Sequence, residues 1–396
     1  MQLTCDILSR PQNNLEQLNE IAKVWQAYDD IGVETATFKP CYDNDVKISN
    51  DKLKVSYPYV DIIFGTHTLH KLPEDVYKKL NTSKKIKDVL DIDGKIYEGL
   101  PIKRSDKVKA SVTIMNGCNN FCSYCIVPYV RGRERSRKSE DILNEINELA
   151  GQGYKEIMLL GQNVNSYNGG CDFATLLDEC ASFEGEYRVR FMTSHPKDAS
   201  TELIEVISRN KNVAKHFHLP VQSGSSRVLK LMNRKYTREQ YLEKAFEIKE
   251  KIPEISLTTD IICGFPTETD EDFSETMSLV KEVGFTSLFT FIYSPRKGTP
   301  AAEMEDPIPA ETKSAWFQEL SAVQEAVSAE SLAKLVGTEQ RALLESVGEG
   351  FIEARLASNS VVRVQADPAL IGRHATIRID DARSWIMNGT VLSVEE

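Results

Sequence analysis

The sequence predicts an α/β protein of three parts, centred on an open partial (β/α)6 barrel with TIM-like winding. Between residues 109 and 308, six apolar runs of strand length alternate with helical stretches, which indicates a parallel sheet with helices outside it. Six units are too few for a complete (β/α)8 barrel, so the sheet is expected to stay open. The flanking residues follow different patterns, which predicts a small N-terminal α/β domain and a small C-terminal β-barrel.

The central part, residues 104–333, has six predicted strands, over residues 111–115, 156–160, 189–193, 217–221, 257–263 and 287–293. Helices are predicted between them, for example over 139–150 and 238–251. Thr237 precedes the second of these as N-cap, with Gln240 at the capping-box position. Thr269 begins another helix, whose acidic first turn complements the helix dipole. Ligands of such a sheet are expected at the C-terminal ends of its strands.

The N-terminal part, residues 1–100, is expected to be a small α/β domain. It has strand-like runs at residues 3–4, 33–38 and 59–64 and a helical pattern over residues 15–25. The segment 84–107 is charged and weakly patterned, which predicts a linker.

The C-terminal part, residues 334–396, follows a long predicted helix over 310–335. Five short strands are predicted there, over residues 342–347, 351–355, 361–364, 375–379 and 389–394. This pattern is typical of small β-barrels that bind oligonucleotides, although a module that only adds stability has the same pattern. Phosphate contacts and base stacking could come from Arg341, Arg355, Arg363, Arg373, Arg378, Arg383 and Trp385.

Composition and charge limit the class of protein. The chain has 396 residues, 41% of them hydrophobic and 27% charged, which suits a soluble globular protein. No run of 18 apolar residues and no signal-peptide pattern occur, so we expect no membrane contact and a cytoplasmic location. The net charge of −11 argues against indiscriminate nucleic-acid binding, but the basic run at residues 131–138 offers a local patch.

A cysteine motif carries the main chemical prediction. Cys118, Cys122 and Cys125 have the spacing C-x3-C-x2-C. Three thiolates on one loop can hold three irons of a 4Fe–4S cube and leave the fourth iron open, and S-adenosylmethionine is the cofactor that uses such an open iron. The alternatives are a zinc knuckle or three structural cysteines. Zinc would want a fourth Cys or His nearby, and none follows before Cys171.

Polar residues at the strand ends are candidates for binding the cofactor. Asp260 lies inside an apolar predicted strand, where a carboxylate is costly to bury unless it is paired. Arg234 could clamp the methionyl carboxylate through two hydrogen bonds, although it could also be an ordinary helix-end arginine. Gln162 and Asn163 could instead be loop amides that cap turns, and His195 could be a loop histidine whose hydrogen bonds are satisfied within the protein. The candidates are Gln162, Asn163, Ser194, His195, Gln222, Ser223, Arg234 and Asp260.

With these motifs, the chain resembles the radical S-adenosylmethionine methylthiotransferases, in particular the branch that modifies tRNA, the 2-methylthio-N6-dimethylallyladenosine synthases. The stretch 381–385 resembles part of that family's TRAM domain, an RNA-binding β-barrel. The strings that carry the resemblance lie at residues 57–67, 118–137, 160–165, 193–198, 218–224, 232–234, 259–266 and 293–300.

The resemblance implies an enzyme with two clusters. The cluster on Cys118, Cys122 and Cys125 would cleave S-adenosylmethionine to a 5′-deoxyadenosyl radical, which removes hydrogen from C2 of the modified adenosine next to the anticodon. A second 4Fe–4S cluster in the N-terminal domain would supply the sulfur. The family uses three N-terminal cysteines for it, whereas this chain has only Cys5 and Cys41 there, so its first domain is expected to be truncated or divergent.

The resemblance also implies partners and leaves alternatives. The expected partners are tRNA and an electron donor such as flavodoxin or ferredoxin, and the chain is expected to be a monomer. One alternative is a methylthiotransferase that acts on another tRNA base or on a ribosomal protein. The other is a tRNA-binding paralogue that has lost sulfur insertion.

Overall fold

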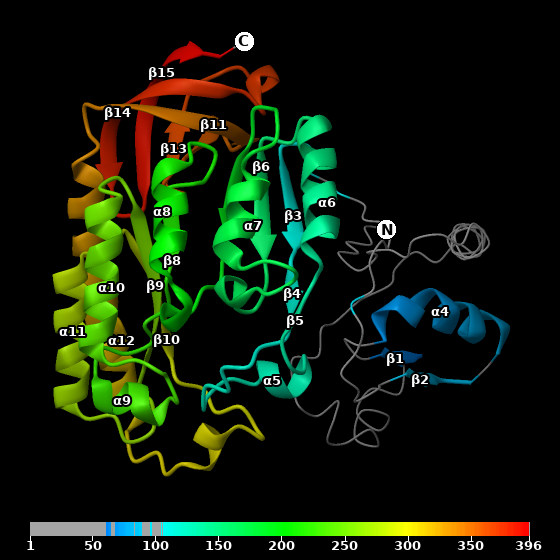
Figure 1. Cartoon of the computed structure of the whole chain (residues 1–396). Coiled ribbons are helices and arrows are strands. Elements are labelled where there is room, and N and C mark those ends of the chain that lie inside the picture. Colours follow the sequence, from blue (N-terminus) through cyan, green and yellow to red (C-terminus); the bar gives the residue numbers. More distant parts are fainter. Residues whose placement is uncertain are drawn as a thin grey trace.

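The computed structural model describes residues 61–64, 68–82, 84–88, 96, 104 and 106–395 (Figure 1). The predictions made for residues 1–60, including the two cysteines Cys5 and Cys41 as cluster ligands, lie outside the described residues.

Six parallel strands follow one another across the central sheet in chain order. Strands β3, β6 and β7 form one ladder, and β8, β9 and β10 form a second. A bridge between Val189 and Val213 joins the two ladders. Among the described residues no ladder joins β10 back to β3, so the sheet is an open partial barrel, as predicted. The strands are β3 (Lys109–Thr113), β6 (Glu156–Leu160), β7 (Arg188–Phe191), β8 (His216–His218), β9 (Ser256–Cys263) and β10 (Ser287–Ile292).

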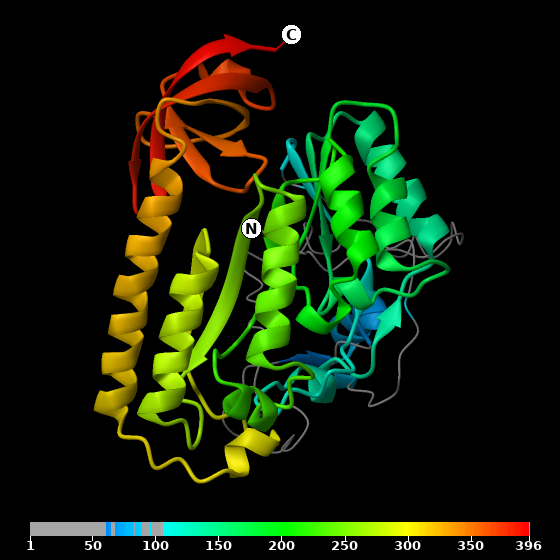
Figure 2. The same ribbon diagram turned by 60° about the vertical axis from the view of Figure 1, so that its left-hand side comes forward.

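Helices cover the outer face of this sheet (Figures 1 and 2). Alternate strand residues point outward because successive side chains of a strand face opposite ways. Val112, Leu159 and Phe217 are therefore buried against the helices in one core. The helices are α6 (Ser139–Gly151), α7 (Phe173–Cys180), α8 (Thr201–Arg209), α10 (Arg238–Lys251), α11 (Asp270–Val283) and α12 (Ala310–Ala333).

Local capping sets where two of these helices begin. Thr237 and Gln240 form the predicted capping box at the start of α10. Thr269 caps α11, and Asp272 returns the hydrogen bond to its backbone. Each box satisfies amide groups that a helix leaves without partners at its first turn.

The C-terminal strands form a closed barrel in the order β11-β12-β13-β15-β14. Its core contains Ala342, Leu344, Val362, Ile377 and Met387. All five predicted strands are present, but β14 and β15 extend further than expected because residues 381–383 continue the antiparallel ladder past a register shift. The strands are β11 (Glu339–Val347), β12 (Ile352–Leu356), β13 (Val361–Val364), β14 (His374–Arg383) and β15 (Ile386–Val394).

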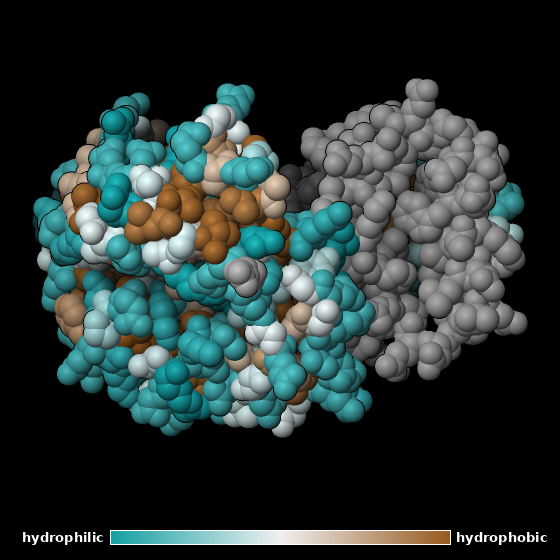
Figure 3. Space-filling view, turned by 90° about the horizontal axis from the view of Figure 1, so that it is seen from above, coloured by the Kyte–Doolittle hydropathy of each residue, from teal (hydrophilic) through white to brown (hydrophobic). Residues whose placement is uncertain are grey.

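The C-terminal barrel closes one end of the open sheet, the end at which β3, β6 and β7 begin (Figure 1). Arg190 of β7 donates to the backbone oxygens of Leu356 and Ala357, both at 3.4 Å. Lys109 of β3 pairs with Glu345 of β11 at 3.3 Å. Seen from above the barrel, the described surface is mostly hydrophilic, with one apolar patch (Figure 3).

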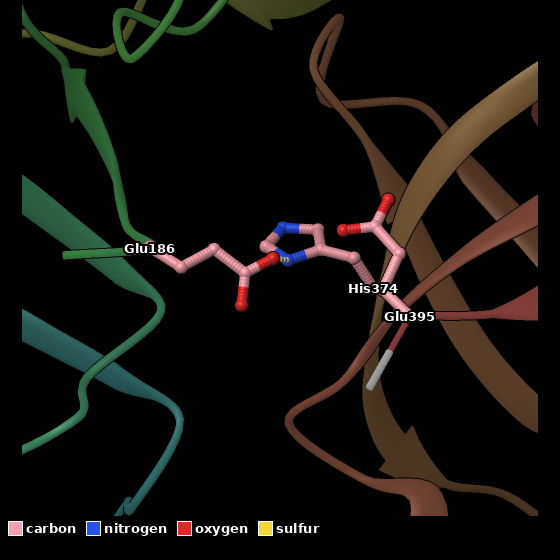
Figure 4. Close-up of side chains that lie close together, drawn as sticks. All are labelled: Glu186, His374 and Glu395. Carbon is pink, nitrogen blue, oxygen red and sulfur yellow. Dashed lines mark hydrogen bonds and ion pairs between the residues drawn. The ribbon is translucent and has the colours of Figure 1, made fainter.

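A group of charged residues at this junction has the ligand types of a metal site, namely Glu186, His374 and Glu395 (Figure 4). However, Arg341 donates to both carboxylates, at 2.7 and 2.6 Å, and Lys155 pairs with Glu186 at 2.7 Å. Two cations therefore already balance the two carboxylates, and the group is an ion-pair network between the core and the barrel.

The N-terminal elements that the structure describes form a β-α-β unit. Strands β1 (Ile62–Phe64) and β2 (Ile86–Asp88) pair in parallel, and α4 (Leu72–Asn81) follows a short 3-10 helix, Leu69–Lys71. The prediction of a linker over residues 84–107 is wrong for β2. Such a short strand has a single apolar residue and no readable period, so only its pairing with β1 reveals it. No helix in the described parts of the chain is long and apolar enough to cross a membrane.

Candidate functional site

The cysteine loop begins where β3 ends, at the C-terminal edge of the sheet and opposite the C-terminal barrel (Figure 1). A two-stranded ribbon of β4 (Met115–Asn116) and β5 (Arg135–Ser136) closes it. Gly117 has φ +78°, and a Cβ there would lie 2.1 Å from the Arg133 carbonyl oxygen. Only glycine fits where the backbones of Gly117 and Arg133 approach each other so closely. This contact places the start of the cysteine loop beside the basic run.

Gln162 fixes the same loop from the neighbouring strand. Its Oε1 accepts a hydrogen bond from the Gly117 amide at 2.6 Å. Gln162 follows β6, as predicted, but its side-chain oxygen already accepts a hydrogen bond from the loop. We therefore place Gln162 as a support of the loop.

The segment after α9 (Ser226–Leu231) holds the other side of the loop. Ser123 donates through its amide to Met232 O at 3.0 Å and through its hydroxyl to Leu231 O at 2.8 Å. Asn233 donates to the carbonyl of Phe121, which has φ +47°. The loop is thus fixed between β6 and α9 before any ligand binds.

The three thiols lie in a dry environment with N–H donors nearby. Cys118 and Cys122 are buried, and Cys125 is half-buried. Burial raises the pKa of Cys118, and it raises the pKa of Cys125 to about 11. The backbone amides of Asn120 and Val127 partly offset this rise in the pKa of Cys118 and Cys125, respectively. Without a bound cation these two groups are neutral thiols at pH 7.

Arg234 completes the surroundings of the thiols. Its Nη1 lies 3.4 Å from Cys122 Sγ, its Nη2 donates to Pro220 O at 2.7 Å, and its Nε donates to the Tyr236 hydroxyl at 2.7 Å. The side chain is buried, so its charge acts at short range. The two-bond clamp on a carboxylate stays a prediction, and in this structure one of the guanidinium nitrogens is directed at a cysteine sulfur.

Two buried polar atoms at the neighbouring strand ends have no partner among the described residues. They are Asn163 Oδ1, after β6, and Ser194 Oγ, after β7. The amide nitrogen of Asn163 donates to Asp198 at 2.9 Å, which orients the free oxygen. Because a buried polar atom without a hydrogen bond is destabilising, such atoms mark places where a polar ligand fits.

His195 is held through its backbone and through one ring nitrogen, because its Nδ1 accepts a hydrogen bond from the Lys197 amide at 3.3 Å. Its backbone exchanges hydrogen bonds with the Asn165 side chain, at 2.9 and 3.0 Å, and its ring packs edge-on against Tyr236. Burial, with the Arg234 and Lys197 charges nearby, lowers the pKa of His195 to about 2. The imidazole is therefore neutral across the physiological range.

Gln222 and Ser223 extend the edge of the sheet. Gln222 has φ +74° and bonds through its backbone to both Asp260 and Ile262 of β9. The Ser223 hydroxyl lies 3.4 Å from that of Thr276 in α11. The Ser223 hydroxyl also accepts a hydrogen bond from the Ser225 amide at 3.2 Å, so both residues shape the strand end.

Asp260 faces the lumen of the partial barrel and is not fully buried. Its side chain is 26% exposed, and its Oδ1 lies 3.5 Å from His218 Nε2. The carboxylate is only partly buried because alternate residues of β9 face the lumen, and its role as a ligand or substrate contact stays a prediction. His218 was not predicted, although its place two residues after His216 in a short strand is a signal for that face.

The basic residues of both predicted patches are largely engaged within the protein. Arg137 donates to Thr113 O and to Glu145, at 2.7 and 2.8 Å. Arg133 lies 4.4 Å from the centre of the Phe121 ring. On the C-terminal barrel, Arg355 pairs with the buried Glu345. Arg341 belongs to the junction described above. The more exposed basic side chains there are Arg373, Arg378 and Arg383, and Trp385 is 48% exposed.

This donor set fits a site-differentiated iron–sulfur cluster. Three sulfurs on one rigid, largely buried loop and a guanidinium beside one of them are features that hold such a cluster and tune its potential. Iron would also deprotonate the coordinating thiols, which burial alone keeps neutral. The two unpartnered polar atoms lie on adjacent strand ends, where a nucleoside cofactor would need partners.

Comparisons with known proteins agree with this chemistry. The model of the radical SAM superfamily matches residues 112–280. A tRNA-2-methylthio-N(6)-dimethylallyladenosine synthase of Acetivibrio thermocellus is 49% identical over 349 residues, which cover 86% of this chain and 73% of that protein. A synthase of the same name from Carboxydothermus hydrogenoformans is 42% identical, with 98% of this chain and 89% of that protein covered.

Among solved structures, the cobalamin-dependent S-adenosylmethionine radical enzyme OxsB matches with a TM-score of 0.45 and 14% identity, and the match covers 81% of this chain and 47% of that chain. The extent and identity of the sequence matches decide the assignment. The chain belongs to the tRNA-2-methylthio-N(6)-dimethylallyladenosine synthase family of the radical SAM superfamily.

Proposed function

We propose that this chain is a radical SAM methylthiotransferase that modifies C2 of N6-dimethylallyladenosine next to the anticodon of tRNA. The relatives carry this activity in their names. The observation on this chain that supports it is the rigid loop of Cys118, Cys122 and Cys125, with the buried Arg234 guanidinium 3.4 Å from the Cys122 sulfur.

In this proposal, Cys118, Cys122 and Cys125 hold three irons of a 4Fe–4S cluster. When bound, the cluster and S-adenosylmethionine supply a carbon radical that can remove a hydrogen atom from an unactivated C–H bond. Arg234 offsets the negative charge that the thiolates bring into a buried loop. Asn163 and Ser194 present the two unpartnered polar atoms to the cofactor. Gln162, His195, Gln222 and Ser223 keep the strand ends in place, and Asp260 faces the lumen.

A second 4Fe–4S cluster on Cys5 and Cys41 belongs to the same proposal, as source of the inserted sulfur. Iron content separates one cluster from two, because about four irons per chain correspond to one cluster and about eight to two. Four irons, together with cleavage of S-adenosylmethionine but no methylthiolated product, would favour a tRNA-binding paralogue that has lost sulfur insertion.

The C-terminal barrel is proposed to be a TRAM domain that contacts the tRNA. Its exposed Arg373, Arg378 and Arg383, with Trp385, offer phosphate contacts and a stacking face. A reducing, cytoplasmic location, a monomeric state and a flavodoxin or ferredoxin as electron donor complete the proposal.

The decisive experiment uses the full chain, reconstituted anaerobically with iron and sulfide. It is incubated with S-adenosylmethionine, a reductant and tRNA that carries N6-dimethylallyladenosine, and the tRNA is then digested to nucleosides. We expect 5′-deoxyadenosine and the 2-methylthio nucleoside. A product found on protein alone, or on another base, would replace the tRNA substrate proposed here.

The matched variants are Cys122→Ala and Cys171→Ala. Loss of Cys122 leaves a cube with two protein ligands, so both products should fall below detection. Cys171 is a half-buried cysteine before α7 and outside the loop, so its removal should leave both products in place. Full activity of Cys122→Ala would refute the ligand assignment.

A further inference from the structure

The last strand of the open sheet exposes two large aromatic side chains. Phe289 and Phe291 of β10 are each 51% exposed. Leu288, whose side chain points away from the lumen, is buried in the same core as Trp316 and Leu320 of α12. The strand therefore packs one face against α12 and leaves two phenyl rings on the other.

That other face is the lumen of the partial barrel. In the ladder between β9 and β10, Phe289 lies opposite Asp260, and Phe291 lies opposite Ile262. The ring of Phe289 is 6.0 Å from that of His218, edge to face. The rings of Phe289 and Phe291 thus lie next to the His218–Asp260 pair. We call this surface the aromatic wall: its apolar part is the two rings, and its polar part is the imidazole and the carboxylate.

The aromatic wall lies toward the end of the sheet that carries the cysteine loop. Phe291 lies near the end of β10, and thus toward the edge of the sheet that carries the cysteine loop. The opposite end of the lumen is closed by Glu156, Arg188 and Arg190 under the C-terminal barrel. A molecule that enters the lumen therefore meets the aromatic wall on the open, cysteine-loop side.

We propose that Phe289 and Phe291 recognise the apolar N6 substituent and the face of the substrate adenine, and so select the prenylated base over plain adenosine. This inference rests on the proposed function and deepens it. Aromatic side chains stack on bases splayed out of single-stranded RNA loops. A branched five-carbon group prefers an apolar surface to water. The Asp260 carboxylate offers an acceptor to the single N6–H that remains on the substituted adenine.

The wall fits this ligand better than it fits a segment of protein. An apolar face that receives a protein segment needs a broad patch, whereas here two rings are flanked by a carboxylate and an imidazole. A planar heterocycle with one apolar arm matches both halves of the wall. Plain adenosine matches only the stacking part and the polar edge.

The test measures binding of two labelled anticodon stem-loop RNAs to the reconstituted full chain by fluorescence anisotropy. One RNA carries N6-dimethylallyladenosine next to the anticodon, and the other carries adenosine there. We expect the wild-type chain to bind the prenylated RNA about tenfold more tightly, which corresponds to partial burial of the five-carbon group. Phe289→Ala and Phe291→Ala should each remove most of that preference, mainly by weakening binding of the prenylated RNA.

Two further variants control the test. Phe246→Ala removes a ring of α10 that is 43% exposed but lies outside the lumen, and it should keep the wild-type preference. Phe291→Leu keeps an apolar side chain and should retain more preference than Phe291→Ala. Equal losses for both RNAs, or an unchanged preference, would overturn the inference. A drop in thermal stability with unchanged RNA binding would also overturn it, since a segment of the chain would then cover the wall.

The two proposals fail in different ways. If the wild-type chain makes no 2-methylthio nucleoside, the proposed function fails, whatever the binding data show. If it makes this nucleoside and the two phenylalanine variants discriminate between the RNAs as the wild type does, only the aromatic wall is refuted.

Discussion

The two ends of the partial barrel differ in how their buried charged and polar groups are stabilised. At the end under the C-terminal barrel, Glu156 pairs with Arg188 and Arg190 at 2.7 and 3.0 Å. At the other end, Asn163 and Ser194 keep polar atoms without partners, and two phenyl rings stay exposed. One end is closed by an ion-pair network and a docked domain, although Arg190 Nε there also lacks a partner among the described residues, while the other end leaves aromatic surface exposed. This division agrees with the rule that ligands of parallel barrels bind at the C-terminal ends of the strands.

Two buried glutamates make the contrast quantitative. Burial tends to raise the pKa of Glu156, but the charges of Arg190 and Arg188 outweigh it and hold that pKa at about 2. Burial raises the pKa of Glu268, in the loop after β9, to about 7, because it outweighs the hydrogen bonds from the amides of Gly264 and Phe265, at 2.6 and 3.0 Å, and the charge of Arg227. At the first end two cations thus stabilise the buried carboxylate in its charged form, whereas at the second end burial favours the neutral form.

The largest expected effect is on the cysteine loop. Gly117→Ala would place a Cβ 2.1 Å from the Arg133 carbonyl oxygen, so the loop must shift and the bound iron should fall to a small fraction of the wild-type content. Gly153→Ala is the matched control, because Gly153 also has a positive φ but a Cβ there meets nothing within 4 Å. Iron and sulfide analysis after reconstitution measures the effect. Equal iron contents would mean that the close approach is unimportant for the cluster.

The next largest effect is expected at the closed end. Glu156→Ala leaves Arg188 and Arg190 buried without their anion, which should lower the free energy of unfolding by about 3–5 kcal/mol. Glu184→Ala, at an exposed position, should change it by less than about 0.5 kcal/mol. Urea unfolding followed by circular dichroism measures both. A small loss at Glu156 would show that the network is not what secures this end.

The two glutamates should respond to pH in opposite directions. The folded pKa of Glu156 is depressed, so its contribution is present above about pH 4.5 and is lost as the pH falls towards 2. The folded pKa of Glu268 is raised, so its contribution is present below about pH 4.5 and is lost as the pH rises to about 7. Each shift is worth roughly 3 kcal/mol.

Glu268→Gln isolates the second response. The amide oxygen can still accept from Gly264 and Phe265 but does not ionise, so the variant should gain stability over the wild type as the pH rises from 4.5 to 7. Unfolding curves at pH 5 and pH 8 give the comparison. A difference between the two proteins that does not change with pH would show that Glu268 is not the titrating group.

The smallest effect is expected at the exposed junction. Arg341→Ala removes the cation between Glu186 and Glu395, but all three side chains are about half exposed, so the loss should be at most about 1 kcal/mol. The loss should shrink further in 0.5 M salt, which screens such pairs. A larger, salt-independent loss would place a buried contact at this junction.

Much of the fold could be predicted because it follows local rules. The apolar runs and the alternating helices identified six strands, and the capping pairs at Thr237 and Thr269 located two helix starts. The C-x3-C-x2-C spacing identified the cysteine loop, because three ligands within eight residues leave few other arrangements. The strand β2 was missed, because three residues carry no period.

The cofactor candidates show where sequence reasoning ends. It placed Gln162, His195 and Ser223 correctly at strand ends, but their hydrogen bonds run to Gly117, Asn165 and Thr276. Residues far apart in the chain make these contacts, so no spacing in the sequence reveals them. The same holds for Arg234, whose guanidinium reaches Cys122 across more than a hundred residues.

The sequence by itself determined the order of the strands and the cysteine loop, because these depend on periodicity and spacing along the chain, and its longer motifs carried the resemblance to the family. The tertiary structure alone decided which polar groups are satisfied and which are left for a ligand. It also decided that the C-terminal barrel closes one end of the lumen and that β10 turns two phenyl rings into the open part. Those outcomes depend on packing between distant segments, which local propensities do not encode.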